Sequence, residues 1–292
     1  MSRILILDSV KAVAIILIVF IHLYNYLLHH PIAGCHGLIA LLSFLALAGF
    51  TFVSGYTIHA NNSVMGTRED VIRFYKKRVL RVYPLYLIAL AAFFVCFQVL
   101  RLFPPLELSS AEWAINVLCL QVLLAPAFTD PVFTLWFVGF IVPLYLLYPA
   151  LIMFSRTTKD ILLVSGCIFA PLVILHLTLN IVDARFLRYY FFFIAGIIAA
   201  RSGIRFSRFE SGLQGRGAGI TAASYASYCV YLFHMPAFAV SAAFMGRLSL
   251  VWYLHDAAMY MVVLVLFGLS YGVQKAYDAH IRSLLSGKAA PG

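Results

Sequence analysis

Long apolar stretches follow one another along almost the whole chain, separated by short polar segments. Most of them reach the roughly 20 residues that an α-helix needs to cross about 30 Å of hydrocarbon. The pattern therefore predicts an all-α fold, a polytopic bundle of about eight transmembrane helices. The predicted spans are residues 5–27, 37–60, 80–100, 134–154, 160–179, 187–203, 218–242 and 251–273.

One further apolar stretch, residues 111–127, differs from the others. It is short, contains Glu112, Asn116 and Gln121, and ends at Pro126. Polar and irregular backbone at membrane depth is tolerated only against protein or a water-filled cavity. We therefore expect a re-entrant or interfacial helix here, with a total of nine or ten spans as the alternative.

The domain organisation is expected to be simple. The chain shows no internal repeat and no polar region long enough for a soluble domain. We predict one transmembrane domain over residues 1–279 and a disordered cytoplasmic tail over residues 280–292. The first apolar stretch is as long as the later ones and is not followed by a small-residue cleavage site. It is therefore interpreted as a spanning helix rather than a signal peptide.

Composition and charge agree with a membrane location. Only 11% of the residues are charged, whereas a soluble domain carries about 25%. If the N-terminus is inside, 17 of the 21 Lys and Arg residues lie on the cytoplasmic side, and only Arg101, Arg185, Arg188 and Arg247 lie outside. The positive-inside rule then predicts that both termini are cytoplasmic. It also accounts for the net charge of +10 without a nucleic-acid partner.

The five cysteines stand singly, and four of them lie in apolar stretches. They form no CxxC pair and no Cys/His pair of the kind that holds a metal ion. We expect them to be small apolar core residues, and we predict no metal cofactor.

The first predicted span carries three ionisable residues on one stripe. Asp8 and Lys11 are three residues apart and can pair. His22 follows Lys11 by eleven residues, about three helical turns, and so lies about 16 Å further along the axis. Ionisable residues inside a membrane usually line a pathway or a site. His22 is therefore the candidate catalytic residue, with Asp8 and Lys11 beside it; a hydrogen bond to a neighbouring helix is the alternative.

A basic cluster leads into the third predicted span. Arg78 and Arg81 are three residues apart at the expected cytoplasmic interface, with Lys77 next to them. Two guanidinium groups at this spacing form a fork for phosphate oxygens. Coenzyme A carries such phosphates, so this cluster is predicted to bind an acyl-CoA donor. Interfacial anchoring is the alternative, and it explains Arg73, Lys76 and Lys77 well.

Candidate contacts for the substrate lie in two other spans. Tyr228, Tyr231 and His234 share one helix face at three-residue spacing, and could form a wall or oxyanion contact. Packing is the alternative for such a tyrosine stripe. Trp136, at the outer end of the fourth predicted span, is a candidate contact for the acceptor.

His59 and a group of three charged residues are further polar positions of interest. His59, near the end of the second predicted span, is expected to be interfacial. Asp183, Arg185 and Arg188, between the fifth and sixth predicted spans, could hold a polar acceptor or pair with one another.

Taken in order, these segments resemble the acyltransferase-3 family of bacterial membrane O-acyltransferases, which modify surface and secreted saccharides. The resemblance extends over most of the chain. It is carried by Asp8…Lys11…His22, Phe52-Val-Ser54-Gly55-Tyr56, Tyr75-Lys76-Lys77-Arg78-Val-Leu-Arg81-Val-Tyr83-Pro84, Leu135-Trp136 through Tyr145 and Pro149, Phe193-Ile-Ala-Gly196, and Ser227-Tyr228 through Tyr231, His234 and Pro236.

The resemblance implies that His22 is catalytic and that Arg78 and Arg81 serve the acyl-CoA donor. Two positions depart from the family pattern. Lys11 stands where the family usually has arginine, which keeps the charge but loses the bidentate fork.

The second departure lies in the fourth predicted span. Many members of the family carry a glutamate between the positions of Trp136 and Tyr145, whereas this chain has Ile141 and Val142. If that glutamate assists catalysis elsewhere, this chain must do without it.

The expected protein is an acyl-CoA-dependent O-acyltransferase, most simply an O-acetyltransferase, of the bacterial cytoplasmic (inner) membrane. Acetyl-CoA would donate from the cytoplasm, and a hydroxyl of a cell-surface or exported saccharide or glycolipid would accept. His22 would act as general base or carry the acyl group covalently, and desolvation would keep its ring neutral. The alternatives are a proton-coupled transporter or flippase of a sugar or lipid-linked substrate, with His22 as proton relay, and a non-catalytic assembly or sensor subunit.

Overall fold

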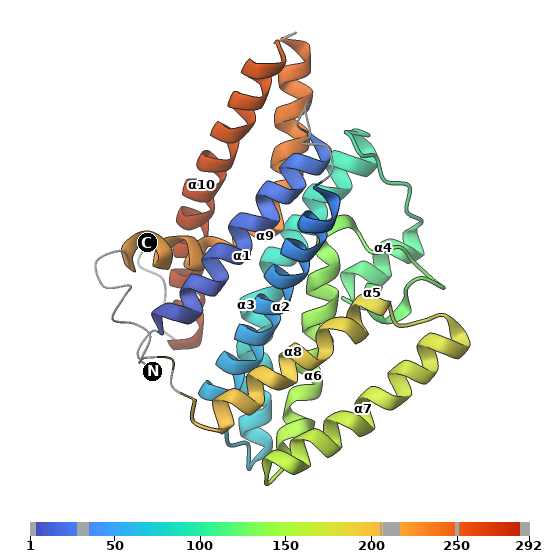
Figure 1. Cartoon of the computed structure of the whole chain (residues 1–292), viewed down its shortest axis with the longest axis vertical. Coiled ribbons are helices and arrows are strands. Elements are labelled where there is room, and N and C mark those ends of the chain that lie inside the picture. The colour runs from blue at the N-terminus through green and yellow to red at the C-terminus, as the bar shows by residue number, and fades with distance from the viewer. Residues whose placement is uncertain (1–3, 28–34, 205, 207–216, 249–250, 287–292) are drawn as a thin grey trace. The chain divides into compact units, whose positions relative to one another are not determined.

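The structure, a computed structural model, describes residues 4–27, 35–204, 206, 217–248 and 251–286. Within these ranges the chain forms α-helices, one π-helix, one 3₁₀ helix and no strand (Figure 1). The all-α prediction is confirmed. The helices are α1 (Leu5–Tyr26), α2 (His36–Asn61), α3 (Arg68–Phe93), η1 (Phe94–Val99), α4 (Ser110–Val117), α5 (Gln121–Leu124), η2 (Phe133–Leu135), α6 (Trp136–Met153), α7 (Thr158–Leu179), α8 (Ala184–Arg201), α9 (Gly217–Arg247) and α10 (Trp252–Ser286).

In the described part of the chain, seven helices are long and apolar enough to cross a membrane. They are α1, α2, α3 with η1, η2 with α6, α7, α9 and α10. The predicted span at 187–203 corresponds to α8, which has 18 residues and includes Arg185, Arg188 and Arg201. These three charges explain why α8 is not among the seven.

The stretch at 111–127 does not form one continuous helix. It contains α4, with eight residues, and α5, with four. At about 1.5 Å per residue, neither can cross about 30 Å of hydrocarbon. The prediction that this stretch is not a full span is therefore correct.

The last helix extends further than expected. α10 continues to Ser286, so the predicted tail at 280–292 is helical in its first seven residues. Residues 287–292 lie outside the described part of the chain.

Local sequence explains where two of the helices begin. Ser109 and Glu112 form a reciprocal capping box at the start of α4, and Thr157 and Asp160 form another at the start of α7. In each case the hydroxyl accepts from a backbone N–H that the helix itself cannot pair, while the carboxylate accepts from the capping residue.

The chain divides into two compact units, which are described separately. Unit 1 contains the described residues of Leu47–Val79 and Glu107–Arg208. Unit 2 contains the described residues of Arg3–Ala46, Leu80–Leu106 and Phe209–Gly292. Helices α2 and α3 each contribute residues to both units.

Unit 1 depends on a close approach between α2 and α8. A Cβ atom at Gly55 would lie 2.1 Å from the carbonyl oxygen of Phe193. A Cβ at Gly196 would lie 2.1 Å from the carbonyl oxygen of Phe52. Small residues of this kind allow backbones to pack closely where lipid gives little hydrophobic driving force.

The same device holds the short helix α5 against α6 in unit 1. A Cβ at Gly139 would lie 2.4 Å from Cδ of Gln121, a fully buried residue. The Gln121 side chain therefore occupies the space that Gly139 leaves open. Its amide also donates to the carbonyl of Leu135 at 3.3 Å.

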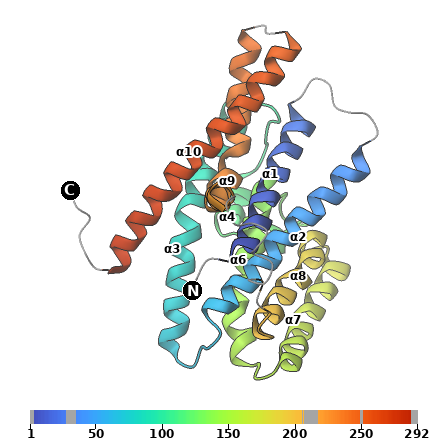
Figure 2. The ribbon, with the colours of Figure 1, turned by 60° about the vertical axis from the view of Figure 1, so that its left-hand side comes forward.

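Unit 2 is organised around α9, which packs against both α1 and α10 (Figures 1 and 2). Polar contacts join α9 to α10. The Tyr225 hydroxyl donates to the Asp278 carboxylate at 2.7 Å, and the Gln274 amide donates to the same carboxylate at 2.9 Å. The Cys229 thiol lies 3.3 Å from the Gln274 amide oxygen.

A substitution at Gly196 tests the close approach of α2 and α8. Gly196→Ala is expected to lower the free energy of unfolding by about 1–3 kcal/mol, because its methyl group overlaps backbone rather than a flexible side chain. Gly166→Ala in α7 is the matched control, because a Cβ there would meet no atom within 4 Å apart from its chain neighbours and the nearby backbone of its own helix. It should be neutral or stabilising by up to about 1 kcal/mol. Thermal unfolding of both variants in detergent measures the two changes in stability. Equal changes would contradict the close packing of α2 and α8.

Candidate functional site

Two histidine rings lie together in unit 2. His22 on α1 and His234 on α9 have ring centroids 5.1 Å apart, and the rings meet edge to face at 61°. His22 is partly exposed and His234 is fully buried, with 0% of its surface accessible.

The hydrogen bonds of both rings identify their tautomers. Nδ1 of His22 lies 2.7 Å from the carbonyl oxygen of Ile18, one turn earlier in α1. Nδ1 of His234 lies 2.8 Å from the carbonyl oxygen of Tyr231. A carbonyl oxygen only accepts hydrogen bonds, so each Nδ1 carries the proton. In the neutral state each Nε2 then keeps a lone pair, which is what a base requires.

Aromatic side chains surround the two rings. The ring of Tyr26 stacks on that of His22, with centroids 6.1 Å apart. Tyr231 and Phe238 lie 6.3 Å and 5.9 Å from His234. The imidazoles thus lie in a largely apolar environment, where hydrogen bonds and charges are felt more strongly than in water.

The other two predicted residues of α1 pair with each other. Nζ of Lys11 lies 3.2 Å from the Asp8 carboxylate, and the Ser224 hydroxyl donates to the same oxygen at 2.6 Å. Asp8 therefore joins α1 to α9 as well as pairing with Lys11. Ser224 was not singled out from the sequence, because a serine in an apolar helix carries no signal of its own partner.

In unit 2, α3 is tied to α9 and α10 near Arg81, which is exposed. Pro84 has no N–H, so the Leu80 carbonyl loses its helical partner. The Tyr277 hydroxyl donates to that carbonyl. The Tyr228 hydroxyl donates to the Val82 carbonyl at 2.7 Å. Tyr228, a predicted substrate contact, thus holds the helix that carries Arg81.

In unit 1, Arg78 lies between two aromatic rings. Its guanidinium carbon is 5.5 Å from the ring centroids of both Phe74 and Tyr145. The Tyr145 hydroxyl is in turn 2.7 Å from the Ser54 hydroxyl. Ring faces attract a guanidinium and restrict its motion without consuming its donors. Lys77, beside Arg78 in the chain, is exposed.

A second polar chain in unit 1 was missed by the sequence analysis. His59 is 3% exposed, and its Nδ1 lies 3.0 Å from the Tyr148 hydroxyl. That hydroxyl donates to the Asn62 carbonyl at 2.9 Å. Because the hydroxyl has only one proton, His59 must be the donor to Tyr148. His59, expected at the membrane interface, is thus buried within the protein and hydrogen-bonded.

Arg201 donates to the segment that follows α6 in the same unit. Its guanidinium donates to the carbonyl of Ser155 at 3.3 Å and to the carbonyl of Arg156. A cation near a helix C-terminus is favoured by the helix dipole and by the free carbonyls there. The sequence gives no sign of this contact, because the two partners are 45 and 46 positions away.

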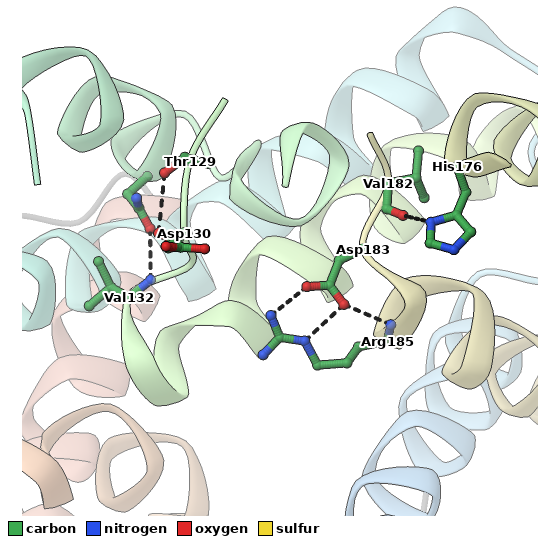
Figure 3. A network of polar contacts seen from close by, with 8 residues as sticks. Thr129, Asp130, Val132, His176, Val182, Asp183 and Arg185 are labelled. Atoms are coloured by element: carbon green, nitrogen blue, oxygen red, sulfur yellow. Dashed lines mark hydrogen bonds and ion pairs between the residues drawn. The ribbon is translucent and has the colours of Figure 1, made fainter. Parts of the chain in front are cut away.

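Trp136, the first residue of α6, lies beside an arginine from the start of α8. The Arg185 guanidinium is 4.7 Å from the Trp136 ring centroid. Figure 3 shows the same guanidinium meeting the Asp183 carboxylate with two donors. Asp183 and Arg185 were expected either to hold a polar acceptor or to pair with each other, and the structure shows that they pair. Burial acts to raise the pKa of Asp183, but hydrogen bonds and charge from Arg185 outweigh it, and the pKa is lowered.

The segment before α8 is held in an unusual backbone conformation. Val182 has φ of +67°, which is rare for a β-branched residue. Its N–H donates to the Leu123 carbonyl at 2.9 Å, and its own carbonyl is 2.8 Å from Nδ1 of His176 (Figure 3). The neighbouring Asp183 N–H donates to the Val122 carbonyl at 2.8 Å. These bonds join the start of α8 to the short helix α5.

The structure thus brings together some predicted residues and separates others by unit. Unit 2 contains His22 with His234 and Asp8 with Lys11, and also Tyr228, Tyr231 and Arg81. Unit 1 contains Arg78, Lys77 and Trp136. Within the described residues, no three His, Cys, Asp or Glu side chains are grouped so that they could hold a metal ion.

The long apolar helices of the described part of the chain define a polytopic membrane protein. A family model described as an acyltransferase domain matches residues 4–271. The chain therefore belongs to the acyltransferase-3 family and is a multi-pass membrane acyltransferase. Comparisons with curated proteins and with solved structures found no match.

The tie between Tyr277 and Leu80 can be tested by a double-mutant cycle. Tyr277→Phe should destabilise the protein by about 1–3 kcal/mol, because it leaves a partly buried carbonyl without a donor. In a Pro84→Ala background the restored N–H at position 84 can pair with Leu80, so the same change should cost clearly less. Thermal unfolding in detergent measures both costs. Equal costs in the two backgrounds would show that Tyr277 does not compensate for Pro84.

Proposed function

We propose that this acyltransferase is an O-acetyltransferase that uses acetyl-CoA as donor. The acceptor is a hydroxyl of a cell-surface or exported saccharide or glycolipid. The enzyme works in the bacterial cytoplasmic membrane with both termini in the cytoplasm, the orientation that its distribution of Lys and Arg favours. The observation that carries the proposal is the His22 ring, partly accessible and with a free Nε2 lone pair, in a chain of the acyltransferase-3 family.

His22 acts as the general base in this proposal. Its Nε2 takes the proton of the acceptor hydroxyl while that oxygen attacks the thioester carbonyl carbon. The C–O bond forms, the C–S bond breaks, and the proton on Nε2 passes to the departing thiolate. The products are the ester and free coenzyme A thiol, and His22 returns to its neutral form. The contact of Nδ1 with Ile18 is what keeps Nε2 available through this cycle.

The donor phosphates are proposed to bind the basic residues of α3. Arg78 and Arg81 are one helical turn apart, a spacing that suits bidentate contacts with phosphate oxygens. Lys77 and Arg81 are exposed, and Arg78 is partly buried, with its guanidinium carbon 5.5 Å from the ring centroids of Phe74 and Tyr145. Lys11, paired with Asp8, adds a further positive charge on α1.

Each unit offers candidate contacts for the acceptor, which are considered separately. Trp136, with Arg185 on its ring face, offers an apolar surface and a charged donor side by side. Tyr231 lies close to the histidine pair. Tyr228 contributes mainly by holding α3, because its hydroxyl donates to Val82.

Transfer of label from [¹⁴C]acetyl-CoA tests the proposal. Membranes from cells that produce the protein should pass label to their glycan or glycolipid fraction, and His22→Ala should reduce the rate by at least about 100-fold, as expected for loss of a general base. His280→Ala is the matched control, because His280 is an exposed residue of α10 away from any proposed role. It should transfer at the normal rate.

Two outcomes would contradict the proposal. Full transfer by His22→Ala would remove His22 as the base. Label transfer from [¹⁴C]succinyl-CoA but not from [¹⁴C]acetyl-CoA would contradict the acetyl assignment while leaving the acyltransferase intact. Mass spectrometry of surface glycans from cells with and without the gene then identifies the added group by its mass.

A further inference from the structure

The buried histidine of the pair has an unused nitrogen. His234 is fully buried, and among the described residues its Nε2 has no hydrogen-bond partner. A buried acceptor without a donor lowers stability, and few are found in native proteins. Leucine or phenylalanine would fill this apolar position without that cost. A histidine is therefore explained best if a transient hydrogen-bond donor pairs with its Nε2.

The position of His234 indicates where such a donor would come from. Its Nδ1 is turned toward its own helix, with the carbonyls of Tyr231 and Val230 at 2.8 Å and 3.2 Å. Nε2 therefore lies on the part of the ring directed away from the α9 backbone. The same holds for His22, whose Nδ1 is turned to Ile18 on α1. Helices α1 and α9 pack together, and the two ring centroids lie 5.1 Å apart, so His22 is the neighbouring ring from which a donor could reach His234.

Two neutral rings in these tautomers cannot hydrogen-bond to each other through Nε2, because both nitrogens are acceptors. One added proton changes this. If His22 is protonated at Nε2, the new N–H can donate to the lone pair of His234. A hydrogen bond from an ionised donor is short and about twice as strong as a neutral one. One added proton on Nε2 of His22 thus allows a hydrogen bond between the two rings that is absent when both are neutral.

We propose that His234 is a positioning residue that stabilises His22 in its protonated form during acyl transfer. This inference rests on the proposed function, in which His22 is the base. As the acceptor hydroxyl attacks the thioester, its proton moves to Nε2 of His22, and Nε2 of His234 accepts a hydrogen bond from the resulting N–H. When the C–S bond breaks, the proton leaves for the thiolate sulfur. Both rings then return to their neutral tautomers.

The same tautomer argues against another role for His234. The sequence suggested a wall or oxyanion contact, and an oxyanion needs a donor. The only N–H of neutral His234 is the one on Nδ1, which is already bonded to Tyr231. The neutral ring can therefore only accept at its free nitrogen.

Two conservative variants separate this role from simple packing. His234→Gln can place its amide oxygen, an acceptor, near the position of Nε2. His234→Asn keeps a donor near the position of Nδ1 but has nothing at Nε2. We expect His234→Asn to lower the apparent kcat by at least about 100-fold with little change in the KM for acetyl-CoA, and His234→Gln to stay within about 10-fold of the unchanged protein. Initial rates of [¹⁴C]acetyl transfer to membrane glycans, measured across acetyl-CoA concentrations, give both constants.

The order of activity of the two variants distinguishes a positioning role from simple packing. If His234 only packs and satisfies its own helix, asparagine should be as active as glutamine or more so, and that order overturns the proposal. Should the asparagine variant not accumulate in membranes, His234→Leu replaces it, because leucine fits the apolar surroundings and lacks any acceptor. Equal kcat for Leu and Gln would overturn the proposal as well.

Failure of the role proposed for His234 can be distinguished from failure of the proposed function. Full activity of His22→Ala contradicts the general base itself. Loss of activity in His22→Ala together with full activity in His234→Asn contradicts only the role of His234.

Discussion

A backbone carbonyl oxygen accepts hydrogen bonds and cannot donate them, and this restriction controls both histidines of unit 2. The carbonyl oxygens of Ile18 and Tyr231 each accept a hydrogen bond from Nδ1 of a histidine on the same helix. The free lone pairs at Nε2 follow directly, and so do their directions away from the helix backbones. The base of the proposed reaction is thus prepared by main-chain groups of α1 and α9, without the carboxylate that orients the histidine of many hydrolases.

The remaining structure of unit 2 keeps these two helices in register. Asp8 accepts from Ser224 and so fixes α1 on α9 at one level, while the histidine rings meet at another. Tyr228 and Tyr277 donate to carbonyls of α3 on either side of Arg81. Pro84 creates one of these free carbonyls, so the sequence feature that disturbs the helix also provides the contact that holds it.

Much of this could be predicted from the sequence. Apolar length gave seven of the eight expected spans, because crossing hydrocarbon imposes a minimum length on every helix. It could not establish α8, whose arginines reduce its apolar character, nor the break between α4 and α5. Three-residue spacing correctly paired Asp8 with Lys11, because that contact is local to one helix.

Contacts between segments that are distant in the sequence could not be predicted from spacing. The sequence marked His22 and His234 separately, but nothing in it placed the two rings 5.1 Å apart. His59 looked interfacial because it stands near the end of an apolar run, and only the fold reveals Tyr148 as its partner. Gly55 and Gly196 are likewise explained by each other's helices, which approach too closely for any side chain.

The central claim is that both imidazoles carry their proton on Nδ1 and leave Nε2 free. Nitrogen-15 NMR of the protein labelled with [¹⁵N]histidine in lipid nanodiscs tests this directly, with the two rings assigned from the signals lost in single-substitution variants. At neutral pH the account predicts a protonated Nδ1 and a bare Nε2 in both His22 and His234. A proton found on Nε2 of His22 with a bare Nδ1 would contradict it, because that ring could not take a proton from the acceptor at its exposed nitrogen.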